Sequence, residues 1–170
     1  MKNNRYMRLN VGFLLKETAG YKRAFEFEAA WSAVSDDLEV KHLGGKVLLT
    51  RTPQGLYASG RLTGFVQAQC VGCLDEFSQP LSAHIAELFV FPPENASPGE
   101  SVVLEDGFID LGPIVRDDML LSAPIRAICR ADCKGLCPQC GANRSQETCD
   151  CANDEVDPRL ATLRVLMEER

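Results

Sequence analysis

The eight cysteines of this chain fall into two groups with the spacing of metal ligands. The first group is the Cys-x-x-Cys pair of Cys70 and Cys73. The second group lies between residues 129 and 151 and consists of Cys129, Cys133, Cys137, Cys140, Cys149 and Cys151. Structural zinc sites use four tetrahedral sulfur or nitrogen ligands, so eight thiols match two such sites. The pattern predicts zinc bound through sulfur, with two ions per chain preferred and one ion as the alternative.

The spacing leaves two arrangements of the thiols open. In the preferred arrangement a local site forms in the second group, and the remaining cysteines tie Cys-x-x-Cys to the C-terminal half. Its two sets are Cys137, Cys140, Cys149 and Cys151, and Cys70, Cys73, Cys129 and Cys133. In the alternative, one zinc binds as in a zinc ribbon and the other thiols stay free. That single set is Cys70, Cys73, Cys137 and Cys140.

Catalysis at sulfur is disfavoured by the same pattern. A zinc ion with four cysteine ligands has no open position for substrate. A Cys–His nucleophile would need His42 or His84, and His84 is expected on a strand as a surface residue. A redox Cys-x-x-Cys of the thioredoxin type lies near a βαβ pattern, whereas Cys70 follows a predicted strand and leads to another. The sequence predicts a protein that is not an enzyme, with a thiol redox protein as an alternative.

Composition indicates an ordinary globular protein. The chain has 170 residues, 45% of them hydrophobic and 25% charged, which suits one domain with or without a small module. No apolar run reaches the roughly 20 residues of a membrane span. The apolar stretch Val11–Leu15 is shorter than a signal-peptide core. We expect a cytoplasmic protein without membrane contact, in which reduced thiols favour metal over disulfides.

Charge is distributed unevenly along the chain. Residues 1–23 carry a local charge of +5, while the rest carries −11. Basic residues can contact RNA phosphate, and the candidates for RNA contact lie in the N-terminal arm and among the cysteines. They are Arg5, Arg8, Lys16, Lys22, Arg23, Arg126, Arg130, Lys134 and Arg144. The alternatives are a solvated N-terminus and compensation of thiolate charge.

The region before residue 92 reads as β-structure. Small or apolar residues alternate with mostly polar ones from Leu56 to Cys70, which is the period of a half-buried strand. A strand over 45–52 precedes it through a turn at 53–55, and a strand over 81–91 follows. The segments 21–27 and 8–15 also read as extended. Cys-x-x-Cys is therefore expected at the tip of a hairpin.

The C-terminal half is predicted to contain two helices around the cysteines. Pro92–Gly99 reads as a loop. Asp110 is expected to cap a helix that ends before Pro124, with an apolar face of Leu111, Ile114, Val115, Met119 and Leu120. A short helix is expected after Asp157-Pro158. The predicted fold class is α+β: an antiparallel sheet or partly open barrel, one packed helix, a zinc-knuckle segment and a short C-terminal helix. The expected domains are 1–125 and 126–170.

Five motifs follow one another along the chain: Leu9-Asn-Val-Gly-Phe-Leu-Leu-Lys-Glu17, Cys70-Val-Gly-Cys-Leu-Asp-Glu-Phe77, the Asp110-Leu-Gly-Pro-Ile helix ending at Leu121-Ser-Ala-Pro124, Cys129-Arg-Ala-Asp-Cys-Lys-Gly-Leu-Cys-Pro-Gln-Cys-Gly141 and Asp157-Pro-Arg-Leu-Ala161. In this order they resemble the YceD family, the large ribosomal RNA subunit accumulation proteins of bacteria and plastids. The resemblance implies a non-enzymatic role in 23S rRNA accumulation or processing and in large-subunit assembly.

The resemblance supplies no mechanism and no catalytic residues. Two kinds of partner fit it: 23S rRNA, met by a local basic surface, or a basic large-subunit ribosomal protein, met by the acidic body. No small-molecule substrate is expected. The alternative from another class is a zinc-dependent protein-interaction scaffold unrelated to ribosomes.

Overall fold

The alternating stretch before Cys70 forms a long strand with one buried face. In the computed structural model, which describes residues 7–35 and 37–151, β4 spans Gly55–Gln69. Its even-numbered residues line the inner face, where Leu56 and Leu62 are fully buried, and its odd-numbered residues are mostly exposed. Successive side chains of a strand point to opposite faces, so the period of two in the sequence identified both the strand and its inner face.

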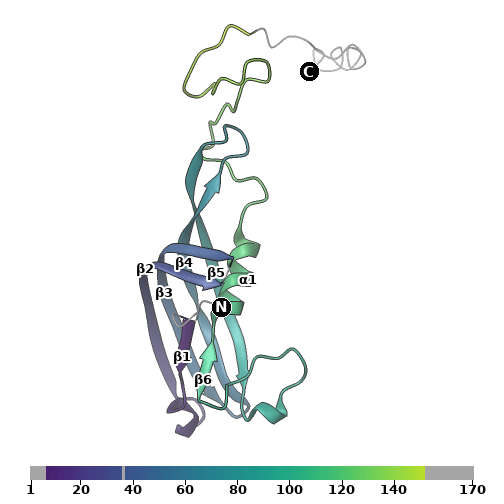
Figure 1. The fold of residues 1–170 in the computed structure, drawn as a ribbon. Coiled ribbons are helices and arrows are strands. Elements are labelled where there is room, and N and C mark those ends of the chain that lie inside the picture. Colours follow the sequence, from purple (N-terminus) through teal and green to yellow (C-terminus); the bar gives the residue numbers. More distant parts are fainter. Residues whose placement is uncertain (1–6, 36, 152–170) are drawn as a thin grey trace, which may run out of the picture.

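The main sheet contains four antiparallel strands in the order β2-β3-β4-β5 (Figure 1). The other three strands are β2 (Lys22–Ser35), β3 (Leu38–Thr52) and β5 (Glu76–Val90). The predicted turn lies between β3 and β4, with Pro53 and Gln54 between the two strands. The segment 93–95 in the predicted loop forms a short 3-10 helix, η3 (Pro93–Asn95).

Three strands are longer than the sequence predicted. β2 continues from residue 27 to 35, β3 begins at 38 instead of 45, and β5 begins at 76 instead of 81. Gly44 and Gly45 obscured the start of β3, since glycine weakens strands; here they follow an irregularity in the pairing with β4. Pro80 obscured the start of β5. The N–H groups of Ser82 and His84 point away from β4, toward α1, and the nitrogen of Pro80 lies on the same edge of β5. The missing N–H of Pro80 therefore removes no hydrogen bond to β4.

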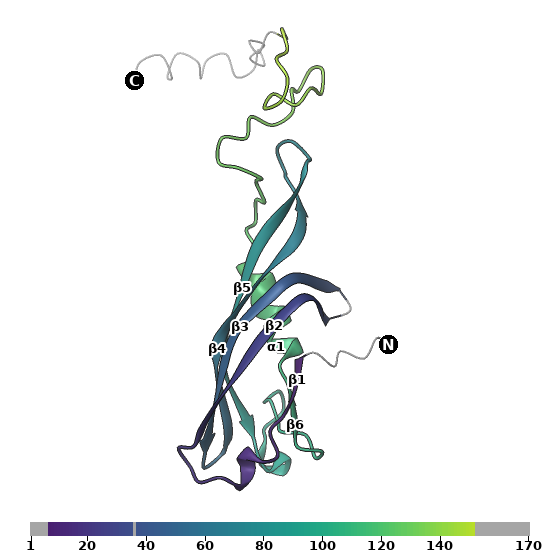
Figure 2. The same cartoon turned by 90° about the vertical axis from the view of Figure 1, so that its left-hand side faces the viewer.

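A second, two-stranded sheet of β1 (Arg8–Asn10) and β6 (Phe108–Asp110) lies beside the main sheet (Figure 2). The prediction of extended chain over 8–15 is wrong beyond residue 10. A 3-10 helix, η2 (Leu14–Lys16), follows because the Leu14 N–H bonds to the Val11 carbonyl at 2.8 Å. Both sheets and α1 share one hydrophobic core, and the sheets stay open. The predicted antiparallel, partly open β fold is confirmed.

Helix α1 (Gly112–Ser122) covers the outer edge of β5. Val115 and Met119 are buried in the core. On the same helix, the Asp118 carboxylate accepts the His84 N–H, and the Ser122 hydroxyl accepts the Ser82 N–H at 3.1 Å. These N–H groups would otherwise form an open sheet edge, so α1 both closes the core and ends the sheet.

Two details of the predicted helix are wrong. Asp110 ends β6, and the N-cap position is held by Leu111, although the Asp110 carboxylate still accepts the Gly112 N–H at 2.8 Å. Leu120, predicted on the buried face, is 42% exposed, because the buried stripe follows a spacing of four residues that reaches 119. The helix ends before Pro124, as predicted.

The two hairpins of the main sheet separate toward one end (Figure 2). The pair Lys41–Phe65 is the last between β3 and β4, and beyond it β4 and β5 continue as a two-stranded arm. The end of β2 and β3 instead lies near α1, where the Arg116 guanidinium donates to the Asp37 carboxylate at 2.8 Å. This contact holds the pKa of Asp37 well below its usual range.

The molecule is elongated, with η2 at one end and the β4–β5 arm and cysteine-rich segment at the other (Figure 1). The described residues after α1 form turns and an isolated bridge between Leu136 and Asn143. The predicted helix after Asp157 lies outside the described residues, and the division at residues 125 and 126 stays a prediction. Within 7–35 and 37–151, no helix is long and apolar enough to cross a membrane.

Candidate metal centres

The tip of the β4–β5 arm positions Cys70 and Cys73. The turn is closed by two hydrogen bonds of 2.9 Å, from the Cys70 N–H to the Asp75 carbonyl and from the Leu74 N–H to the Cys70 carbonyl. Leu74 has a φ of 63°, a left-handed conformation that a leucine rarely adopts. Both thiols are buried. The turn therefore presents two sulfur atoms to the segment that crosses it.

The segment after α1 supplies two further thiols at this tip. The Val71 N–H donates to the Ala127 carbonyl at 2.9 Å and anchors the crossing. The Sγ atoms of Cys70 and Cys133 are 3.8 Å apart, and those of Cys73 and Cys129 are 3.6 Å apart. We call this group the first cluster: Cys70, Cys73, Cys129 and Cys133.

The second cluster is local to the C-terminal segment. Its members are Cys137, Cys140, Cys149 and Cys151. The Cys137 N–H bonds to the Ala142 carbonyl at 2.8 Å, and the Gly141 N–H bonds to the Cys137 carbonyl at 2.9 Å. Gly141 has a φ of 75°, which glycine adopts without strain. This tight knuckle turns Cys137 and Cys140 toward the same point.

The geometry of both clusters fits a tetrahedral metal ion. Four sulfurs bound at about 2.3 Å to a zinc ion lie about 3.8 Å from one another. The two measured separations in the first cluster are 3.8 and 3.6 Å, and the four sulfurs of each cluster lie within 4.8 Å of one another. These separations are far longer than the roughly 2.05 Å bond of a disulfide. Four thiols in this arrangement could each hold one tetrahedral ion through sulfur.

The electrostatics of the clusters also favour a bound cation. Backbone N–H groups of Cys73 and Cys129 lower the pKa of Cys70 to about 6. In the second cluster, the Cys140 thiol and then burial raise the pKa of Cys151 to about 12. The backbone N–H groups of Cys140 and Gln139 lower the pKa of Cys137 to about 6, so each cluster contains one thiol that ionises readily. Further thiolates in the same cluster repel the first. A divalent cation removes that repulsion and allows all four thiols to ionise.

The observed grouping is the preferred one of the two predicted arrangements. The first cluster joins the hairpin tip to the segment after α1, and the second cluster needs no long-range contact. The alternative set, in which Cys70 and Cys73 join Cys137 and Cys140, is not brought together among the described residues. The cysteine order predicted this grouping because two close pairs at the end of the chain can form a site by themselves.

The described basic residues of the N-terminal arm lie far from the clusters. Lys16 in η2 and Lys22 and Arg23 at the start of β2 are exposed at the end opposite the arm tip (Figure 1). A fifteen-residue strand such as β4 spans roughly 45 Å. Arg8 already forms an ion pair on β1, and Arg5 lies outside the described residues. The structure therefore does not join these residues to the basic residues among the cysteines.

Two of the basic residues of the cysteine-rich segment lie before Cys133. Arg126 and Arg130 are exposed. Arg130 is paired with Asp132 at 3.5 Å, and its guanidinium also donates to the Ser145 carbonyl at 3.5 Å. Arg130 is thus oriented toward the loop between the two halves of the second cluster.

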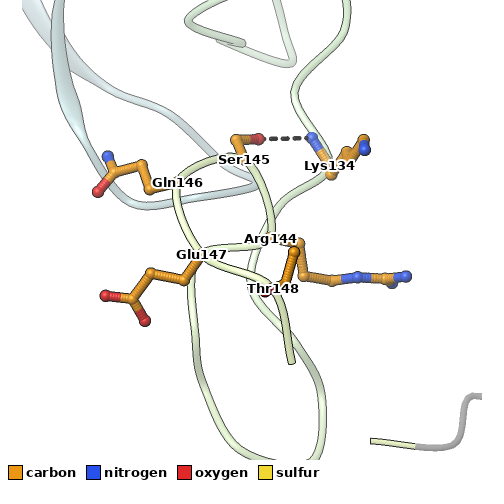
Figure 3. A pocket seen from close by; sticks show the side chains of 6 residues that line it. All are labelled: Lys134, Arg144, Ser145, Gln146, Glu147 and Thr148. Carbon is orange, nitrogen blue, oxygen red and sulfur yellow. Dashed lines mark hydrogen bonds between the residues drawn. The ribbon is translucent and has the colours of Figure 1, made fainter. Parts of the chain in front are cut away.

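Lys134 and Arg144 line an open hollow of about 680 Å³ beside this loop, together with residues 145–148. Figure 3 shows that their side chains extend to the same side, whereas Glu147 extends to the other. The backbone N–H of Lys134 donates to the Ser145 hydroxyl at 3.0 Å and holds the two chain segments that line the hollow together. The hollow can therefore present two cations to an anion.

Three polar residues that connect the clusters had no predicted role. The side-chain amides of Asn143 and Gln146 donate to one carboxylate oxygen of Asp75, at 3.1 and 3.0 Å. Asp75 follows Cys-x-x-Cys by two residues, and the amides lie in the loop between Cys140 and Cys149. The positions of these residues beside the cysteines were the signal in the sequence that could have indicated a supporting role. The hydrogen bonds themselves could not be predicted, because the fold brings together residues about 70 positions apart.

The fold and the two clusters together define a class of protein, an open antiparallel β protein in which the tip of one hairpin supplies two of the four cysteines of a cluster. The family model described as "Large ribosomal RNA subunit accumulation protein YceD" matches residues 58–167. The chain belongs to the YceD family. No solved structure matches the chain significantly.

Relatives support this assignment. An uncharacterized protein of Mycobacterium tuberculosis is 31% identical over 114 residues, covering 65% of this chain and 55% of the relative. The uncharacterized protein YlbN of Bacillus subtilis is 30% identical over 110 residues, 64% of each chain. The Arabidopsis thaliana protein named large ribosomal RNA subunit accumulation protein YCED homolog 1, chloroplastic, is 41% identical over 61 residues, 36% of this chain and 19% of the relative. The chain spans less than two thirds of each of these relatives.

Proposed function

We propose that this chain is a non-enzymatic, cytoplasmic factor for 23S rRNA accumulation and large-subunit assembly in bacteria, with structural zinc in both clusters. The observation that carries the proposal is membership of a family described by large ribosomal RNA subunit accumulation. The Arabidopsis relative carries the same description in its name.

Zinc is the metal that best fits the donor sets. Each cluster offers four thiols and no carboxylate or imidazole, and tetrahedral all-sulfur sites are typical of structural zinc. Four protein ligands leave no position for a bound water or substrate. The zinc would hold the C-terminal segment on the arm, and no reaction is assigned to it.

RNA contact is proposed at the cysteine-rich end of the molecule. Residues 24–125 contain 15 acidic and 5 basic residues, whereas residues 126–151 contain 3 acidic and 4 basic residues. Two filled four-cysteine sites at −2 each would bring residues 126–151 to a net charge of −3, so RNA contact there depends on exposed local cations and not on the net charge of the segment. The hollow beside Lys134 and Arg144 is its most concentrated pair of cations.

Removing these two charges is expected to weaken RNA binding in a salt-dependent way. In the variant Lys134→Ala/Arg144→Ala, the negative slope of log affinity against log salt for 23S rRNA fragments should become shallower by about 0.7–0.9 per lost phosphate contact. Filter binding from low to moderate salt measures this slope. The control is Lys46→Ala, an exposed lysine of the main sheet paired with Glu26 at 3.2 Å. An equal loss in both variants would argue against a localised contact.

A basic large-subunit protein is the second candidate partner, favoured by the excess of acidic residues over 24–125. Selective capture of such a protein by the purified chain, retained after nuclease treatment, would support it. In that case the Lys134→Ala/Arg144→Ala variant should bind the protein as tightly as the wild type.

Depletion of the protein in its own host tests the proposed function as a whole. The amount of 23S rRNA should fall relative to 16S rRNA, and expression of the intact chain should restore it. The protein should also sediment with large-subunit precursors in a sucrose gradient. An unchanged ratio together with no sedimentation on precursors would favour the scaffold unrelated to ribosomes.

A further inference from the structure

The two clusters share a short link that packs on the hairpin tip. Cys133 of the first cluster and Cys137 of the second are separated by three residues. Within this link the Leu136 N–H donates to the Gly72 carbonyl at 3.0 Å. Gly135 has a φ of 71°, and a Cβ there would lie 3.0 Å from the same Gly72 oxygen. A side chain at 135 would be strained and crowded, so glycine permits this close approach.

Asp75 makes a second connection between the same two parts. Its carboxylate accepts the amides of Asn143 and Gln146 at 3.1 and 3.0 Å. Asn143 also bridges Leu136 on the other side of the knuckle. The turn that carries Cys70 and Cys73 therefore also contacts the second cluster's segment on both sides of its knuckle, at Leu136 before it and at Asn143 and Gln146 after it.

We propose that the two clusters bind metal as a coupled pair and that Asp75 is the positioning residue that couples them. This inference rests on the proposed zinc binding. A metal ion in the first cluster fixes the hairpin tip against residues 127–133, which places the Gly72 carbonyl and the Asp75 carboxylate. These acceptors then order the loop of the second cluster before its own ion binds. Ordering that is already complete makes the second binding step more favourable.

Charge repulsion between the two filled sites acts against this coupling. Each ion with four thiolates carries a formal charge of −2, and like charges at short range disfavour simultaneous occupancy. The backbone N–H of Arg144 bonds to the Gly135 carbonyl at 3.0 Å, in the link between the clusters. Arg130 is already paired with Asp132, which leaves Lys134 and Arg144 as the positive charges beside this link. Their positive charge offsets the repulsion, so the ordering effect should dominate.

Reciprocity gives the first test, because coupling must change both affinities by the same factor. The full chain is titrated with zinc against a chelator, and protection of each cluster's thiols from alkylation is read by peptide mass spectrometry. Cys149→Ser/Cys151→Ser should weaken zinc binding at the first cluster about tenfold, within the range typical of coupled sites, and Cys70→Ser/Cys73→Ser should weaken zinc binding at the second cluster by the same factor. An unchanged affinity of the intact cluster in either variant would overturn the coupling.

Asp75→Ala gives the second test, since it keeps all eight thiols. We expect its second cluster to bind zinc about tenfold more weakly, in the range typical of lost outer-shell hydrogen bonds. Asp75→Asn retains an acceptor oxygen and should restore most of that affinity. Glu76→Ala, at the exposed carboxylate next to Asp75, is the matched control and should bind zinc as the wild type does.

The possible failures of this experiment are distinguishable. Equal affinities in Asp75→Ala and the wild type would overturn the role of Asp75, as would an equal loss in Asp75→Asn and Asp75→Ala. Two zinc ions bound independently would overturn the coupling and leave the proposed function standing. A chain that binds no zinc would overturn the coupling and the proposed zinc binding, whereas the depletion experiment tests the role in 23S rRNA accumulation separately.

Discussion

Replacing Cys133 with serine is expected to release residues 126–151 from the arm while the main sheet stays folded. Cys133 is a member of the cluster that joins the arm tip to the C-terminal segment. Structural zinc binding in small domains is coupled to folding and is worth on the order of 10–16 kcal/mol. Much of that energy is lost with one ligand. The amides of Val71 and Leu136, which bond across this junction, should lose protection in hydrogen exchange, and the zinc content should fall.

The matched control for this substitution is Val71→Ser. Val71 lies between Cys70 and Cys73, is 52% exposed and contacts the segment through its backbone N–H. The Val71→Ser substitution introduces a serine hydroxyl beside the same cluster but removes no sulfur. The zinc content and the hydrogen exchange of the junction amides should therefore stay as in the wild type. Retention of both properties in Cys133→Ser would mean that the first cluster does not clamp the segment.

Shortening Leu56 to alanine is expected to lower the free energy of unfolding by about 2–5 kcal/mol. Leu56 is fully buried in β4 and belongs to the core that both sheets and α1 share. Its replacement leaves a cavity that neighbouring side chains cannot fill completely, because the core is closely packed. Chemical denaturation of the intact chain, followed by circular dichroism, measures the change.

Leu121→Ala makes the same chemical change at an exposed position and serves as the comparison. Leu121 in α1 is 84% exposed, so its replacement should change the free energy of unfolding by no more than about 0.5 kcal/mol. Similar destabilisation in both variants would contradict the inner face assigned to β4.

The central hairpin could be predicted from sequence because its pattern is local. The alternation from Leu56 to Cys70 specifies a strand, its buried face and a cysteine at its end. The starts of β3 and β5 could not be predicted, because glycine and proline usually interrupt strands. In this fold Gly44 and Gly45 follow an irregularity in strand pairing, and the Pro80 nitrogen points away from β4. Tertiary context thus overrides the local preference.

The candidate site was predictable to the same degree. The cysteine spacing favoured the observed two clusters, since ligand pairs separated by one to three residues can meet within a turn, but it left the single-site arrangement open. The acceptor role of Asp75 could not be read from the sequence. Its partners Asn143 and Gln146 lie in a polar loop, and only the crossing of the segment over the arm brings them within 3.1 Å.

The most direct test of the account is the zinc content of the intact chain, purified under reducing conditions and measured by inductively coupled plasma mass spectrometry. Two zinc ions per chain are expected, with all eight thiols protected from alkylation until a chelator is added. One ion per chain, no metal, or disulfides in place of metal would contradict the two-site account.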